Sequence, residues 1–125
     1  MTLKVIIVED EKEILNLYKQ IFNKQAGAIV FASSGNEARK ILSKERVGMI
    51  ISDYIMPSGD GKELLRYVER KFPQILFYYH SGTHLTLEDE PFVKGLIRKP
   101  QGVTAMVDLV LKFVAQRVNQ EAVLT

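Results

Sequence analysis

Five polar side chains come directly after apolar runs of the sequence, and their types suggest a shared chemistry. The run LKVIIV is followed by Glu9 and Asp10, and GMIIS is followed by Asp53. ILFYYH precedes Ser81, and GLIR precedes Lys99. Three carboxylates brought together repel one another unless a cation joins them. Hard oxygen ligands in this number favour Mg²⁺ or Mn²⁺.

A divalent ion beside these groups suits phosphoryl transfer. The metal and the ammonium group of Lys99 would neutralise charge on the phosphoryl oxygens, and the hydroxyl of Ser81 would donate a hydrogen bond. Asp53 would be the nucleophile, attacking in line to give an aspartyl phosphate. Because an aspartyl phosphate is a labile mixed anhydride, the modification would be reversible.

These side chains can meet only if the elements that carry them share one sheet. Apolar runs of strand length alternate with amphipathic helical patterns, which calls for a parallel sheet with right-handed crossovers and helices on both faces. In such sheets the sites form at the carboxyl ends of the strands. Strands are predicted over 3–8, 28–32, 48–53, 75–80 and 94–98, and helices over 11–24, from Ser34, from Asp60 to Pro73, and over 103–118.

Local signals support two of these helices. Ser34 is followed three residues later by Glu37, the spacing of a capping box at a helix start. Apolar side chains of the first helix recur at helical spacing and predict one buried stripe. That stripe consists of Ile14, Leu17, Tyr18, Ile21 and Phe22.

Composition limits the class of protein. The chain has 125 residues, 46% hydrophobic and 26% charged, which fits a single globular domain. It has no cysteine, so disulfides and thiolate chemistry are excluded, and we expect a cytoplasmic location. The net charge of +2 is small and interspersed, so we expect no direct nucleic-acid binding. The N-terminal apolar run is too short for a signal peptide or membrane insertion.

Four motifs, in order and each at a predicted strand end, carry a resemblance to a known family. They are VIIVEDE, IISDYIMPSGDG, HSG and RKP. Over nearly its whole length the sequence resembles the receiver domain of two-component response regulators. The resemblance implies a flavodoxin-like, doubly wound sheet of strand order 2-1-3-4-5. It also implies that residues 1–125 form one receiver domain without an effector domain.

The resemblance implies a role for each matched residue. Asp53 would accept a phosphoryl group from a histidine kinase or histidine phosphotransfer protein, while Ser81 and Lys99 would contact that group. Gly61 would shape the loop after the acceptor. Such a phosphorelay switch takes part in its own phosphorylation and hydrolysis and is not a metabolic enzyme. The Mg²⁺ ligands would be Glu9, Asp10, Asp53 and the backbone carbonyl of Ile55.

The sequence departs from the family in the region of output. Leu96 stands three positions before the lysine, where most receivers have an aromatic residue that moves when the phosphoryl group arrives. The stretch 82–95 is also short, and it contains a proline and a poor helical pattern. We therefore expect a short or missing fourth helix and a remodelled partner surface. Output would run through contact with a downstream protein.

The last predicted helix is apolar over more than one face. Such an excess indicates either a partner surface, most simply in a homodimer, or deeper burial because the fourth helix is missing. Only a narrow polar strip remains, formed by Thr104, Asp108, Lys112 and Asn119. The apolar residues are Val103, Met106, Val107, Val110, Leu111, Val114 and Val118.

Simpler interpretations of the same residues remain open. Asp53 could be a turn residue at a strand end, and Glu9 and Asp10 could only favour the start of a helix. His80 and His84 suggest a metal or phosphohistidine site, but no third nitrogen ligand accompanies them. The rival function is a receiver-fold scaffold or interaction module that does not depend on phosphorylation. A flavin-binding protein would share the fold, but acids after the first strand would repel its phosphate.

Overall fold

The computed structural model of the protein describes residues 3–54, 56, 61–82, 86–99 and 103–124, with the backbone alone over 117–124. Strands and helices alternate as the sequence pattern predicts, except that the fifth strand follows the fourth with no helix in the described residues between them. The strands are β1 (Lys4–Val8), β2 (Ile29–Ala32), β3 (Val47–Ser52), β4 (Leu76–Ser81) and β5 (Val93–Arg98). The helices are α1 (Lys12–Ile21), the single turn η1 (Asn23–Gln25), α2 (Gly35–Leu42), α3 (Gly61–Lys71) and α4 (Val103–Leu124).

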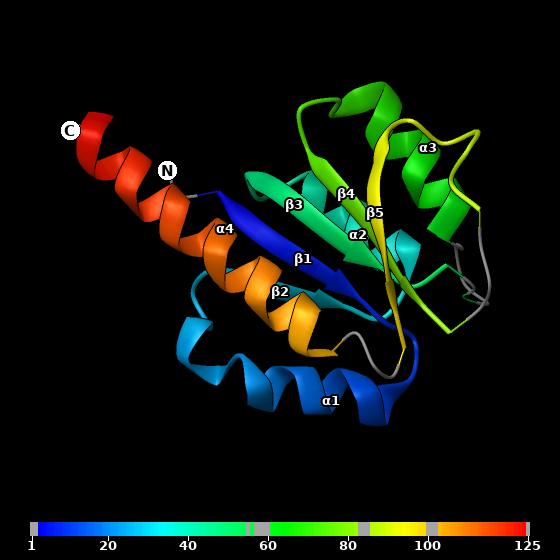
Figure 1. The fold of residues 1–125 in the computed structure, drawn as a ribbon, viewed down its shortest axis with the longest axis horizontal. Coiled ribbons are helices and arrows are strands. Elements are labelled where there is room, and N and C mark those ends of the chain that lie inside the picture. The colour runs from blue at the N-terminus through cyan, green and yellow to red at the C-terminus, as the bar shows by residue number, and fades with distance from the viewer. Residues whose placement is uncertain (1–2, 55, 57–60, 83–85, 100–102, 125) are drawn as a thin grey trace.

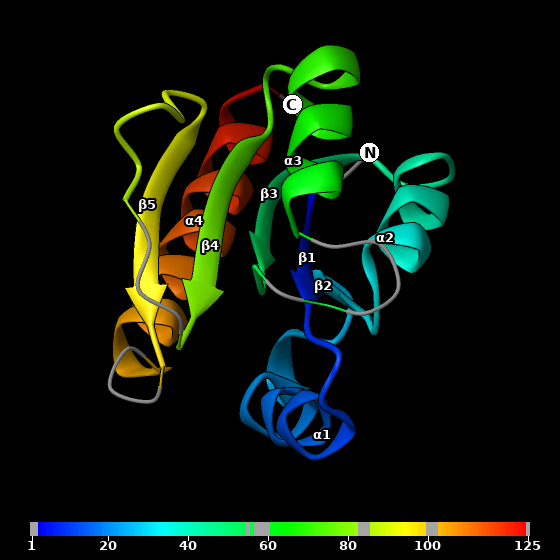
Figure 2. The same ribbon diagram turned by 90° about the vertical axis from the view of Figure 1, so that its right-hand side faces the viewer.

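The five strands form one parallel sheet in the order β2-β1-β3-β4-β5, which confirms the predicted flavodoxin-like topology. The strand arrows in Figure 2 therefore point the same way, and their carboxyl ends share one edge. Strands β1 and β3 are buried on both faces because helices cover both, which explains their continuous apolar runs.

Two apolar clusters separate the faces of the sheet. Alternate strand residues turn to opposite sides, so Ile6 and Ile50 join α2 and α3, whereas Ile7 and Ile51 join α1 and α4. In Figure 1, α1 and α4 lie in front of the sheet and α2 lies behind it. The candidate site must therefore form at the strand ends, between these two layers.

The buried stripe of α1 differs from the predicted one. Tyr18 and Phe22 are buried, but Leu17 and Ile21 are 49% and 37% exposed, and Leu15 is buried instead. Tyr18 and Phe22 join the α1/α4 cluster on the sheet and Ile14 packs against it, so the buried face is narrower than the apolar pattern and includes Leu15 in place of Leu17 and Ile21. Spacing alone located the helix but not the centre of its buried face.

The capping signal of α2 is confirmed in part. Ser34 Oγ accepts a hydrogen bond of 3.1 Å from the backbone N–H of Glu37. The Glu37 carboxylate does not complete a reciprocal capping box; it accepts a bond of 2.6 Å from the hydroxyl of Ser33.

The connection between β4 and β5 contains no helix in its described residues, 82 and 86–92, as expected. Leu87 and Phe92 pack against the α2/α3 cluster in place of helical side chains. Arg66 of α3 holds the connection through two hydrogen bonds to the Glu90 carboxylate, of 2.6 and 2.9 Å. The fourth helix of the chain is therefore the last one, α4.

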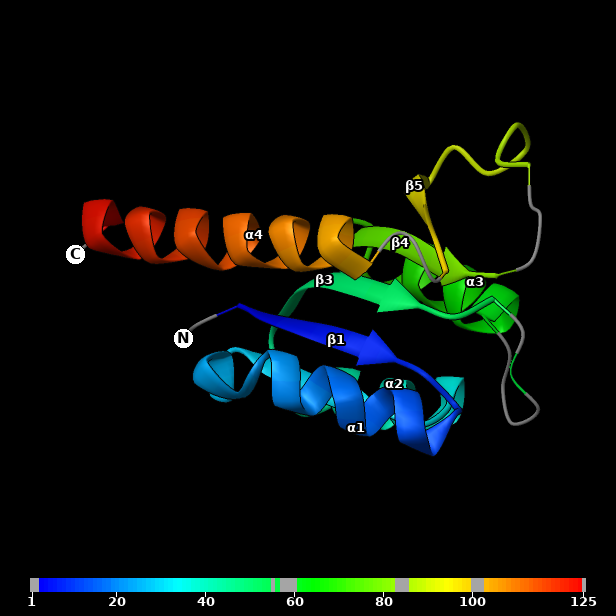
Figure 3. The same cartoon turned by 60° about the horizontal axis from the view of Figure 1, so that its bottom comes forward.

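The last helix lies on the opposite face of the sheet from Leu87 and Phe92, so the lack of a helix among the described residues of the connection does not explain its apolar character. Met106 and Val110 are fully buried against the sheet, while Leu111 is exposed. The helix runs to Leu124, beyond the predicted end at 118, and Figure 3 shows it continuing past the amino ends of the strands. Among the described side chains of α4, most apolar ones therefore cover the sheet and Leu111 stays exposed, while Val118 and Asn119 lie outside the described side chains.

Candidate functional site

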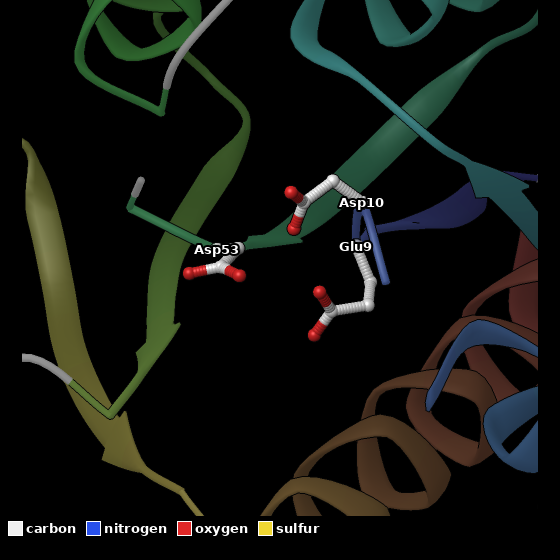
Figure 4. A group of neighbouring side chains, drawn as sticks. All are labelled: Glu9, Asp10 and Asp53. Atoms are coloured by element: carbon white, nitrogen blue, oxygen red, sulfur yellow. The ribbon is translucent and has the colours of Figure 1, made fainter. Parts of the chain in front are cut away.

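The carboxyl edge of the sheet brings together the three predicted acids. Glu9 and Asp10 follow β1, and Asp53 follows the neighbouring strand β3. One carboxylate oxygen from each lies within 4.8 Å of the others, and Figure 4 shows the three side chains converging. Glu9 is 1% exposed and Asp53 is 8% exposed, whereas Asp10 is half-buried. The cluster therefore opens to solvent on the side of Asp10.

Lys99 supplies the counter-charge. It directly follows β5, and its ammonium group forms ion pairs with Glu9 and with Asp53, the latter at 3.0 Å. The lysine thus joins a carboxylate from each of two other strand ends. With every group ionised, three carboxylates against one ammonium leave two negative charges in excess. This excess matches a divalent cation.

Burial makes the cluster electrostatically unusual. Burial raises the pKa of Glu9 to about 7, although the bond from Lys99 and a 3.1 Å bond from the Glu11 backbone N–H both oppose the rise. Burial alone would lower the pKa of Lys99, but its hydrogen bonds to Glu9 and Asp53 raise it. Lys99 therefore stays charged, and Glu9 can exchange a proton near neutral pH.

The backbone around Asp53 is held tightly. The Asp53 N–H donates to the carbonyl of Val8 at 3.0 Å, and the buried hydroxyl of Ser52 donates to the Asp53 carbonyl at 2.8 Å. Gly61 returns the chain to this point, with its N–H donating to the Tyr54 carbonyl at 2.9 Å. A β-carbon on Gly61 would lie only 2.3 Å from the Asp53 carbonyl oxygen. The close approach of Gly61 to Asp53 leaves no room for a β-carbon, so only glycine fits at this position.

Ser81 ends β4 at the same edge and is buried. Its carbonyl accepts a 3.1 Å bond from the backbone N–H of Lys99, so the two predicted phosphoryl-binding residues are tied through the backbone. Ile55, predicted to offer a carbonyl ligand, lies outside the described residues, as does His84. Leu96 is half-buried and packs against the α2/α3 cluster.

His80 does not join the acid cluster of the described residues. It is buried and hydrogen-bonded to Tyr18 of α1 and to the carbonyl of Ile97 in β5. Sequence reasoning considered His80 as a ligand and missed Tyr18 as its partner. A signal was present, since both are polar-tipped residues within otherwise apolar buried patterns, but their pairing depends on the tertiary fold.

Comparison with protein families identifies the family of this chain. The model of the response regulator receiver domain matches residues 5–110. The chain belongs to this family. Among the described residues of this receiver, no helix is long and apolar enough to cross a membrane.

Solved structures support the same fold. A CheY-like receiver domain protein from Methanospirillum hungatei JF-1 is 20% identical, with a TM-score of 0.76 and coverage of 96% of this chain and 99% of the other. A receiver domain protein from Clostridium thermocellum is 25% identical, with a TM-score of 0.71 and coverage of 98% and 99%. A signal receiver domain of an HD domain-containing protein from Pseudomonas fluorescens Pf-5 is 19% identical, with a TM-score of 0.78 and 98% coverage of each chain.

Proposed function

We propose that this receiver domain accepts a phosphoryl group on Asp53 in a two-component phosphorelay. The observation that carries the proposal is the grouping of a buried carboxylate, two further acids and a lysine at one sheet edge, with Lys99 Nζ 3.0 Å from Asp53. A structural cap would not need the other acids or a shared ammonium group. The donor would be a histidine kinase or a histidine phosphotransfer protein.

The donor set fits Mg²⁺ or Mn²⁺. Glu9, Asp10 and Asp53 offer hard oxygen ligands and an excess negative charge, and the Ile55 carbonyl, outside the described residues, is the further ligand proposed. When bound, the ion supplies charge neutralisation for a phosphoryl group near Asp53. The half-buried Asp10 lies on the solvent side, where a hydrated ion would enter.

The residues of the chain have complementary tasks in the transfer. A carboxylate oxygen of Asp53 bonds to phosphorus while the phosphorus–nitrogen bond of the donor's phosphohistidine breaks, and the freed imidazole takes up a proton. Lys99 is released from its carboxylate partners to neutralise the incoming oxygens, and Ser81 donates a hydrogen bond to one of them.

The phosphorylated domain would act through contact with a downstream protein. Because an aspartyl phosphate is labile, the same site would also lose its phosphoryl group by hydrolysis and reset the switch. We place the protein in the cytoplasm, where a donor kinase has ATP, and propose a homodimer through α4. Exposed Leu111 on α4 supports such a surface.

Three observations favour a second candidate, a scaffold that does not depend on phosphorylation. Lys99 already satisfies two of the three acids without a metal, and Leu96 and the helix-free 86–92 connection replace features of the usual switch. In that case the acid cluster would serve stability alone.

Binding of beryllofluoride, a phosphoryl mimic, tests the proposal. We expect saturable, Mg²⁺-dependent amide NMR shifts around Asp53, Ser81 and Lys99, and their loss in Asp53→Asn, which removes one ligand charge and keeps the side-chain size. Absence of binding at millimolar Mg²⁺ in a folded wild-type protein would reject the phosphoacceptor function and leave the scaffold.

A further inference from the structure

A buried hydrogen-bond chain crosses the α1/α4 face of the sheet near the candidate site. Tyr18 of α1 and His80 of β4 are each 2% exposed. The Tyr18 hydroxyl lies 2.6 Å from His80 Nε2, and His80 Nδ1 lies 3.0 Å from the carbonyl oxygen of Ile97 in β5. Two hydrogen bonds therefore join a helix and two strands inside an apolar layer.

The chemistry of the partners fixes the direction of both bonds. A carbonyl oxygen can only accept, so His80 Nδ1 carries the proton and donates to Ile97. Burial lowers the pKa of His80, which keeps the ring neutral and leaves Nε2 as an acceptor. The Tyr18 hydroxyl therefore donates to Nε2. Every polar atom of the imidazole is satisfied, and the ring can occupy only one tautomer.

Each member of this chain adjoins part of the candidate phosphoryl site. Tyr18 lies on the helix that starts two residues after Asp10, and His80 immediately precedes Ser81. Ile97 is paired with His80 in the β4–β5 register and lies two residues before Lys99. The helix after Asp10, the strand that carries Ser81 and the strand that precedes Lys99 are thus joined by this one buried hydrogen-bond chain.

We propose that Tyr18 and His80 are positioning residues of the phosphoryl site, which hold the carboxyl ends of β4 and β5 against α1. They thereby set the separation of Ser81 and Lys99 from the acidic cluster. This inference rests on the proposed function of that site. Neither side chain touches the phosphoryl group; each acts through the backbone of the strand or helix that carries it.

Packing alone does not account for these residues. Apolar side chains of the same size would fill the space at similar or lower cost, because a buried hydrogen bond replaces one made with water. A directional, fully satisfied chain instead selects one relative position of three elements. By contrast, the side chain of Leu96, on the opposite face of β5, packs against the α2/α3 cluster by apolar contact alone.

Matched variants separate positioning from packing. Tyr18→Phe removes one hydroxyl, and His80→Asn retains a donor for the Ile97 carbonyl but cannot reach Tyr18. The control is Tyr78→Phe, since the Tyr78 hydroxyl makes no hydrogen bond among the described residues although its ring packs on the same face.

The first readout needs no ligand. The backbone N–H of Lys99 donates to the carbonyl of Ser81. We expect hydrogen exchange of this amide to accelerate about fivefold in Tyr18→Phe and in His80→Asn, and to be unchanged in Tyr78→Phe. Imidazole ¹⁵N shifts should report Nδ1–H in the wild type. Perturbation confined to α1, or a wild-type Nε2–H tautomer, would overturn the inference.

The second readout concerns the site itself. Tyr18→Phe should weaken beryllofluoride binding about fivefold, the loss of one modest hydrogen bond, and leave Mg²⁺ affinity within twofold. The double variant should bind beryllofluoride no more weakly than the single variants, because both substitutions break the same Tyr18–His80 hydrogen bond. Unchanged beryllofluoride affinity in both variants would overturn the inference.

The two readouts also separate this inference from the proposed function. If the wild-type protein failed to bind beryllofluoride, the phosphoacceptor function would be rejected, and with it the role of the chain at a phosphoryl site. The Lys99 exchange would still decide whether Tyr18 and His80 position the sheet edge.

Discussion

Replacing Gly61 with alanine tests the geometry that presents Asp53. The added β-carbon would lie 2.3 Å from the Asp53 carbonyl oxygen, 2.9 Å from Tyr54 Cα and 3.0 Å from the Tyr54 carbonyl oxygen. Ordinary contact begins near 3.4 Å, so the backbone must separate by roughly 1 Å at the closest point. All three obstacles are backbone atoms, so a side-chain rotation cannot relieve the clash.

Two magnitudes follow from this displacement. Overpacking of this kind costs about 1–3 kcal/mol in the free energy of unfolding. Alanine otherwise favours a helix over glycine by up to about 1 kcal/mol, so without the clash Gly61→Ala would stabilise α3. A misplacement of about 1 Å at a reacting group costs about 100-fold in rate. We therefore expect beryllofluoride affinity to fall at least about tenfold.

Urea denaturation and beryllofluoride titration with Mg²⁺ measure the two effects. Gly27→Ala is the control, because a β-carbon at Gly27 would meet no atom within 4 Å. We expect Gly27→Ala to match the wild type in affinity. If Gly61→Ala proved as stable as Gly27→Ala and bound equally well, the close approach to Asp53 would not constrain this loop.

Three further predictions concern charge and capping. Lys99→Met removes the cation shared by Glu9 and Asp53, so Mg²⁺ should bind about tenfold more tightly. Beryllofluoride should bind more weakly, because it loses the ammonium group. An unchanged Mg²⁺ affinity in titrations would contradict this prediction. Because the pKa of Glu9 is about 7 and only its ionised form binds metal, Mg²⁺ affinity should be about tenfold weaker at pH 6 than at pH 8, and Glu9→Gln should remove that dependence. Ser34→Ala should lower the free energy of unfolding by about 1 kcal/mol in urea denaturation, and an equal loss in Ser33→Ala would argue against the cap.

The sequence by itself determined the order of the elements and the edge at which chemistry could occur. Apolar runs alternating with helical patterns specify a parallel sheet, and a parallel sheet brings the residues after its strands to one edge. The positions of Glu9, Asp10 and Asp53 therefore followed from local pattern alone. The short 82–95 stretch also predicted a short or missing helix, because proline and a poor apolar period are local signals, and its described residues form no helix.

Only the tertiary structure decided which groups touch. The pairing of Lys99 with Glu9 and Asp53 joins three strand ends that are far apart in sequence, and the same burial raises the pKa of Glu9. The buried face of α1, with Leu17 exposed, and the bond between Tyr18 and His80 also depend on how a helix settles on its sheet. Periodicity states that a helix has an apolar side, but contacts across the sheet determine which residue occupies its centre.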